Sequence, residues 1–257
     1  MLHDRRNMIW AALPIAGVLI VWELLVRLKV IDSILCPPPT AVLGAALRLL
    51  KTGELGTAVG GTLLRLSIGF GIGAMLGLAL GLFMGAFKIV RRTFEPLISA
   101  LNSTPKLTLL PMLMLFLGIG DAPRITLIAL SALIVLAMHG LDAVRGIHPA
   151  YVDLARNNNA RSTDLLWNVY LPASLPQIFT GFRIAVGRAL VITVTTELIG
   201  GRNGLGNLIW MGWQTFAVEK LYTGVIVTTL LGTVLHWGLV AVEEVVAPWS
   251  VKQRAVI

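Results

Sequence analysis

The sequence has little of what a water-soluble domain or an enzyme contains. Only 13% of its 257 residues are charged, whereas about 25% is usual for soluble domains, and 56% are hydrophobic. The single cysteine, Cys36, excludes an internal disulfide. The chain contains no Gly-x-x-x-x-Gly-Lys-Ser/Thr phosphate loop, no His-Glu-x-x-His and no Gly-x-Ser-x-Gly motif. These absences exclude an ordinary soluble domain, and we expect no catalytic residues and no metal site.

What the chain has instead is long uncharged stretches. Residues 66–87, 125–141 and 221–242 carry no charge, and each is near the about 20 residues that a membrane-spanning helix needs. A fourth stretch, 7–22, reaches residue 28 if Glu23 and Arg27 pair at i,i+4. Two further segments, at about 96–120 and 182–201, are hydrophobic but contain charged residues. The sequence therefore predicts one all-α, polytopic membrane domain over 1–257, with six transmembrane helices at about 8–28, 64–87, 96–120, 124–141, 182–201 and 221–243.

A polar island interrupts these hydrophobic blocks at residues 151–176. It carries charged side chains at Asp153, Arg156 and Arg161, and three consecutive asparagines at 157–159. Asparagine adopts the left-handed backbone more readily than most residues, so the asparagines predict a turn. Apolar residues at helical spacing follow, up to Pro172. The island is therefore predicted to be a short helix, a turn and a second amphipathic helix, an arrangement suited to docking.

The island resembles the cytoplasmic coupling loop of permease subunits of bacterial ABC importers. That loop has an acidic-Ala-Ala triplet, three residues, a glycine, about nine residues, then a hydrophobic residue, Leu and Pro. Here 153–155 (Asp-Leu-Ala) takes the place of the triplet, Asn159 that of the glycine, and 169–172 (Val-Tyr-Leu-Pro) that of the closing element. Further likeness at 110–120, 180–185 and 197–206 is similar to the sulfonate, taurine and nitrate branch, and the resemblance covers about 37–235.

This resemblance implies a type I ABC importer permease fold with a coupling loop at about 143–180. It also implies a homodimer with a second copy of the chain, two cytoplasmic ATPase subunits that bind ATP and Mg, and an extracytoplasmic substrate-binding protein. The permease itself would bind no cofactor. The residues that the resemblance places in the coupling loop are Asp153, Leu154, Ala155, Arg156, Asn159, Ala160, Arg161, Leu165 and Pro172. Of these, Leu154, Ala155 and Leu165 would fill a groove on the ATPase, and the charged residues would make its polar contacts.

The net charge of +8 does not indicate nucleic-acid binding, because the basic residues are scattered at the ends of the expected spans. In the six-span arrangement ten of them fall on one side of the membrane and six on the other. Positive residues favour the cytoplasmic side. The bias therefore predicts a multi-pass protein of the bacterial plasma (inner) membrane, with both termini and the polar island in the cytoplasm.

Polar residues within the third and fifth expected spans are candidates for the translocation pathway. They are Asn102, Ser103, Lys106, Thr108, Arg188, Thr193 and Glu197. Ionisable residues inside a membrane usually face a cavity or a partner, so an anion pathway is one interpretation, with Glu197 as an outer gate. The alternatives are a structural ion pair or snorkelling for Lys106 and a network of hydrogen bonds between helices for the threonines.

The second expected span carries a glycine at every fourth position, namely Gly69, Gly73, Gly77, Gly81 and Gly85. Such a groove lets two helix backbones approach closely in lipid. Tight static packing is the favoured interpretation, and a surface that slides during transport is the alternative.

Three classes of function remain after these arguments. We expect a transmembrane permease subunit of an ATP-driven ABC importer, forming the pathway for a small solute, with small anions such as a sulfonate, taurine or nitrate preferred. The alternative is an ion-coupled secondary transporter or a channel without an ATPase, for which the polar island would have no task. A membrane enzyme is disfavoured, because no nucleophile–base constellation is visible.

Overall fold

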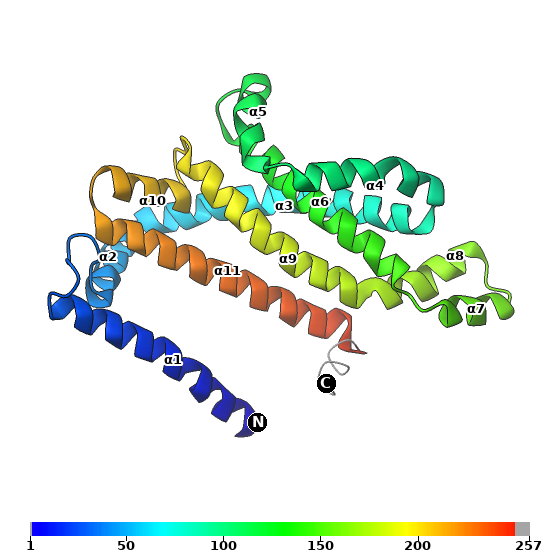
Figure 1. Cartoon of the computed structure of the whole chain (residues 1–257), viewed down its shortest axis with the longest axis horizontal. Helices are drawn as coiled ribbons and strands as arrows, with labels where there is room; N and C mark the ends of the chain where they lie inside the picture. The colour runs from blue at the N-terminus through cyan, green and yellow to red at the C-terminus, as the bar shows by residue number, and fades with distance from the viewer. Residues whose placement is uncertain (1, 250–257) are drawn as a thin grey trace.

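The computed structural model describes residues 2–249, and the side chains within that range except those of residues 2–12, 152, 156, 162, 163, 166 and 167. Every regular element in this range is helical, which confirms the all-α class (Figure 1). The long helices are α1 (Leu2–Arg27), α3 (Glu54–Ala86), α4 (Lys88–Ser103), α6 (Asp121–Arg145), α9 (Leu171–Leu198) and α11 (Val218–Val246). The short ones are α2 (Pro39–Lys51), η1 (Lys106–Leu109), α5 (Leu110–Leu117), α7 (Pro149–Asn157), α8 (Ser162–Leu165), η2 (Leu166–Tyr170) and α10 (Leu205–Gln214).

The packing of α3 against α6 forms the centre of the molecule, and α9 packs against both helices, most extensively against α6. All five glycines of the four-residue repeat face α6. A methyl group at Gly69 would lie 2.7 Å from the Cβ of Ile128, and one at Gly85 would lie 2.5 Å from the Cβ of Val144. At Gly73, Gly77 and Gly81 it would overlap the backbone of α6. The repeat therefore brings two helix backbones into direct contact, and a sliding role for this surface stays a prediction.

Four helices of the described part are long and apolar enough to cross a membrane. They are α3, α6, α11 and the continuous helix Asn168–Leu198 that contains α9. The third expected span, 96–120, is divided: α4 and the η1–α5 segment meet at an angle of 94° and could form a fifth, broken span. The break lies at Pro105, which lacks the N–H that would continue the helix. The first expected span, 8–28, overlaps the 26-residue helix α1. Because the described residues contain four spans, or five with the broken one, by length and composition, a total of six crossings stays a prediction.

Helix α1 lies at one edge of the molecule (Figure 1) and is joined to the rest mainly at its C-terminal end. The expected Glu23–Arg27 pair is confirmed, with 2.7 Å between Arg27 Nε and Glu23 Oε1. The same carboxylate accepts hydrogen bonds from the backbone N–H of Thr40, at 3.1 Å, and from its hydroxyl, at 2.9 Å. Because Thr40 lies in the first turn of α2, where backbone N–H groups lack helical partners, Glu23 ties α1 to the start of α2.

Candidate functional site

The polar island is a helical hairpin, α7 and α8, that extends from one end of the molecule, opposite to α2 and α10 (Figure 1). Asn159 adopts the left-handed conformation, with φ of 58°, as the asparagine run predicts. The backbone N–H of Ala160 donates to the carbonyl of Ala155 at 3.1 Å, and the N–H of Asn158 to that of Leu154 at 3.2 Å. Helices that end at a glycine usually do so with this combination of a left-handed residue and a hydrogen bond from the next N–H to a carbonyl five residues earlier. Asn159 therefore performs the task for which a glycine is more common.

The second arm of the hairpin begins at a carboxylate that sequence reasoning missed. Asp164 Oδ2 accepts a hydrogen bond from the backbone N–H of Arg161 at 2.9 Å, and the carbonyl of Arg161 accepts from the N–H of Leu165 at 3.0 Å. An acidic residue three positions after a helix start commonly satisfies the first N–H group in this way. The arm then passes through the wide turn η2 into α9, where Pro172 lies at the helix start and cannot donate to a preceding carbonyl.

Exposure divides the expected coupling residues into two groups. Asp153, Leu154, Asn159 and Arg161 are exposed, and Ala155, Ala160 and Pro172 are half-buried. Leu165 is only 7% exposed, so it offers little surface to a partner in this conformation, and its place in an ATPase groove stays a prediction. The side chain of Arg156 lies outside the described residues. Among the hairpin side chains that the structure describes, Leu154 is 63% exposed and Tyr151 61% exposed, and the sequence reasoning gave Tyr151 no role.

The opposite end holds an ion network between α3, α6 and α9, in which Arg65, Arg124 and Glu197 are buried and Asp121 is exposed. Arg65 pairs with Glu197 at 2.8 Å and with Asp121 at 2.6 Å, and Asp121 also meets Arg124 at 3.3 Å. Arg65 also donates to the side-chain and backbone oxygens of Asn203. The two acids and two arginines therefore neutralise one another. The sequence reasoning missed Arg65 and Asp121, although a lone charge beside a spanning segment is itself a signal.

Glu197 is fully buried, and its carboxylate organises the start of α10. One oxygen accepts from the N–H of Gly206 at 3.0 Å, and both accept from the hydroxyl of Thr62, at 2.9 and 3.1 Å. Thr62 in turn accepts from the N–H of Leu205 at 2.8 Å. A negative group at a helix N-terminus is stabilising because unpaired N–H groups gather there. Glu197 thus faces the interior of the chain, and an outer-gate role stays a prediction.

The other expected pathway residues lie at the end of α4, in η1 and in α9. Thr193 is buried and its hydroxyl donates to the carbonyl of Ala189 at 2.8 Å. Ser103 and Thr108 are exposed and donate to nearby carbonyls, of Ser99 and Pro105 respectively, and Asn102 is half-buried. Lys106 Nζ donates to the carbonyl of Asn102 at 3.2 Å, and Lys106 lies close enough to Arg188 for their charges to repel. Lys106 and Arg188 therefore lie on two elements, η1 and α9, that contact each other, and neither pairs with Glu197.

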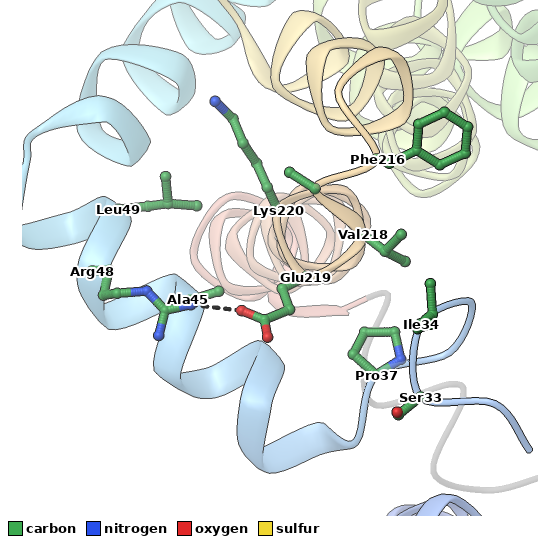
Figure 2. Close-up of a pocket in the computed structure, with 11 residues that line it drawn as sticks. Ser33, Ile34, Pro37, Ala45, Arg48, Leu49, Phe216, Val218, Glu219 and Lys220 are labelled. Carbon is green, nitrogen blue, oxygen red and sulfur yellow. Dashed lines mark hydrogen bonds and ion pairs between the residues drawn. The ribbon is translucent and has the colours of Figure 1, made fainter.

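A pocket of about 400 Å³ opens beside α2 at the same end as the ion network (Figure 2). Its lining includes Pro37, Leu49 and Phe216, and Phe216 is 76% exposed. The Arg48–Glu219 ion pair, at 2.5 Å, lies across it. The described residues contain no cluster of three or more His, Cys, Asp or Glu side chains that could hold a metal ion. The pocket is thus a surface feature lined by both apolar and charged side chains.

Several long apolar helices around a glycine-lined contact, with a polar helical hairpin at one end, define a polytopic membrane permease. The chain belongs to the family of binding-protein-dependent transport system inner membrane components, whose model matches residues 73–247. It is similar to the taurine transport system permease protein TauC of Escherichia coli (strain K12), with 29% identity over 91% of this chain and 87% of TauC. It is also similar to the nitrate import permease protein NrtB of Synechocystis sp. (strain PCC 6803), with 25% identity over 92% and 88%.

The fold is also found in the MetNI methionine ABC transporter, solved in inward-facing conformations. One chain of that transporter matches with a TM-score of 0.65 and 18% identity, over 75% of this chain and 95% of that chain. Together these findings identify the chain as a membrane-spanning permease subunit of an ABC importer, in the branch that includes taurine, sulfonate and nitrate permeases. The chain is a non-enzymatic subunit of an inner-membrane transport system, and ATP hydrolysis belongs to a separate subunit.

Proposed function

We propose that the α7–α8 hairpin is the element by which a cytoplasmic ATPase drives this permease. The observation that carries the proposal is the combination of a fixed turn and an uncovered tip. Hydrogen bonds at Ala155, Arg161 and Asp164 hold the hairpin's backbone, while Asp153 and Leu154 are displayed to solvent. A polar element that is rigid and displays exposed side chains such as Leu154 and Tyr151 can transmit a movement of its partner, because its internal geometry is fixed before docking.

The working assembly is two copies of this chain with two ATPase subunits on the hairpins and a substrate-binding protein at the opposite end. Closure of the ATPases on ATP draws the two hairpins together and opens the pathway outward, and hydrolysis returns it inward. This arrangement places both termini of the chain in the cytoplasm, in agreement with its basic residues. The end that carries α2, α10 and the pocket of Figure 2 then faces the binding protein.

The transported solute is a small anion of the sulfonate, taurine or nitrate kind. Support comes from the relatives that carry taurine and nitrate, and from cations at mid-molecule. The proposed pathway lies along the broken helix and α9, and includes Asn102, Ser103, Lys106, Thr108 and Arg188. Thr193 and Glu197 support this wall from within, because both are buried.

The test is co-purification of the tagged chain from its native membranes in mild detergent. We expect an ATPase to be recovered in equal amount with the parent chain and to be lost with Ala155→Glu, which puts a charge at the docking face. Thr52→Glu is the matched control, because it adds the same carboxylate at an exposed site of the opposite end. Recovery of the ATPase with Ala155→Glu would refute the docking role. Flux in liposomes from the chain alone, without ATP, would instead favour the secondary transporter.

A further inference from the structure

One face of α9 is left uncovered by the rest of the chain. Its exposed positions are Ile184, Gly187, Arg188 and Val191, which follow one another at spacings of three, one and three residues. That spacing is one face of a helix. Ile184 is 39% exposed and Val191 65%, so Arg188 lies in a stripe that the described part of this chain does not cover.

Arg188 lies too deep in the helix to reach the membrane surface easily. It precedes the end of α9, Leu198, by ten residues, which corresponds to about 15 Å at a rise of 1.5 Å per residue. The apolar core of a bilayer is about 30 Å thick. A guanidinium at mid-depth against lipid is costly, so the stripe faces water or protein.

The second cation, Lys106, lies at the break in the third hydrophobic segment. Pro105 ends the helical run, and η1 begins at Lys106 and contacts α9. Lys106 is half-buried, and its only hydrogen bond among the described residues is to the carbonyl of Asn102, at 3.2 Å. The chain thus bends by 94° and brings η1, which begins at Lys106, into contact with the helix that carries Arg188.

Neither cation is neutralised. In residues 2–249, wherever side chains are described, no carboxylate lies within ion-pair distance of Lys106 or Arg188. Elsewhere in the same chain buried arginines are paired, as Arg65 is with Glu197 and Arg183 with Glu243. Two like charges at mid-depth without a counter-ion are unfavourable unless an anion is supplied from outside.

We propose that Lys106 and Arg188 form a mid-membrane binding site for a single small oxyanion, of the sulfonate or nitrate class, on its way through the permease. The inference rests on the proposed function and names the substrate chemistry of its pathway. The planar guanidinium matches two oxygens of a trigonal or tetrahedral oxyanion, and the ammonium adds a point charge from the broken helix. A monoanion neutralises only part of the combined charge, so it is attracted without being trapped.

The experiment measures the local potential at a cysteine placed in the stripe, without ATP or transport. The full chain in membrane vesicles carries Val191→Cys, one turn from Arg188, and Cys36→Ser to remove the native thiol. The probes are the anionic sulfonatoethyl and the cationic trimethylammonioethyl methanethiosulfonates, each of which forms a mixed disulfide with the thiolate and releases methanesulfinate. The ratio of the two modification rates reports whether anions gather at this site.

We expect the anionic reagent to be preferred, and the ratio to fall about tenfold in Lys106→Gln or Arg188→Gln, as the loss of one nearby charge in a partly hydrated site implies. Lys106→Arg keeps the charge and the ratio, which separates loss of charge from misfolding. Lys51→Gln removes an exposed charge at the outer end and is expected to change nothing. Excess methanesulfonate is expected to slow modification in the parent but not in the two glutamine variants.

Three results would overturn the site: no reaction with either reagent, an unchanged ratio in both glutamine variants, or no protection by methanesulfonate. The measurement does not involve the ATPase. Its failure therefore leaves the hairpin's docking role standing, and loss of ATPase binding in the hairpin variant leaves the anion site standing.

Discussion

The two ends of this permease both concentrate polar groups, but they turn them in opposite directions. At the end with α2 and α10, Arg65 and Glu197 are buried and pair with each other, Asp121 completes the network from an exposed position, and Glu197 has no exposed surface. At the hairpin end, Asp153 and Arg161 are exposed, and local hydrogen bonds to the backbone, including one from the Arg161 N–H to the Asp164 carboxylate, hold the turn. The difference teaches that the inward polar groups stabilise the fold, whereas the outward ones are available to a partner.

The largest effect on stability is expected from Arg65→Met. The change leaves the buried Glu197 without its counter-ion, which costs about 3–5 kcal/mol of the free energy of unfolding. Thermal unfolding in detergent, followed by tryptophan fluorescence, checks this. The control is Arg48→Met at the exposed Arg48–Glu219 pair, where about 1 kcal/mol or less is expected. Equal losses in the two variants would show that the inward network does not stabilise the fold.

A second large effect is expected where two helix backbones touch. Gly77→Leu introduces a side chain against the backbone of α6, and the overpacking should cost about 1–3 kcal/mol. Gly71→Leu is the matched control, because no atom lies within 4 Å of the position of its added Cβ. Similar unfolding temperatures for the two variants would show that the α3–α6 contact is looser than described.

A smaller effect is expected at the hairpin turn, where a substitution should raise the stability and not lower it. Asn159→Gly relieves the left-handed strain of a non-glycine residue, which is at most about 1–2 kcal/mol, while Asn159→Val increases it. Hydrogen exchange of the α7 amides measures the local opening of the turn. Slower exchange in the glycine variant than in the valine variant is expected, and the reverse order would contradict the left-handed turn.

The smallest effect on stability is expected at the exposed tip. Leu154→Asp should leave the unfolding temperature nearly unchanged, because surface substitutions are usually within about 0.5 kcal/mol. The same change should abolish ATP-driven uptake of taurine or nitrate by the reconstituted complex, by removing an apolar contact with the ATPase. An unchanged uptake rate would remove Leu154 from the docking surface.

The sequence predicted the elements whose signal is local. Uncharged runs located α3, α6 and α11, the asparagines located the turn at Asn159, and the i,i+4 spacing predicted the Glu23–Arg27 pair. It did not predict contacts that depend on how distant segments meet. Arg65 and Glu197 are 132 residues apart in the sequence, and the burial of Leu165, which is 7% exposed, has no local signal. The right-angle bend at Pro105 likewise follows from packing, because a proline alone specifies a break and not its angle.

The measurement that tests the central claim most directly is site-specific crosslinking from the hairpin tip in intact membranes. In the Cys36→Ser background, a photoactivatable reagent is attached at Leu154→Cys or, as the matched exposed position at the opposite end, at Thr52→Cys. The account predicts a crosslink from position 154 to a nucleotide-binding subunit, identified by mass spectrometry, and none from position 52. No crosslink from position 154, or equal crosslinks from both, would contradict the claim that this hairpin couples the permease to its ATPase.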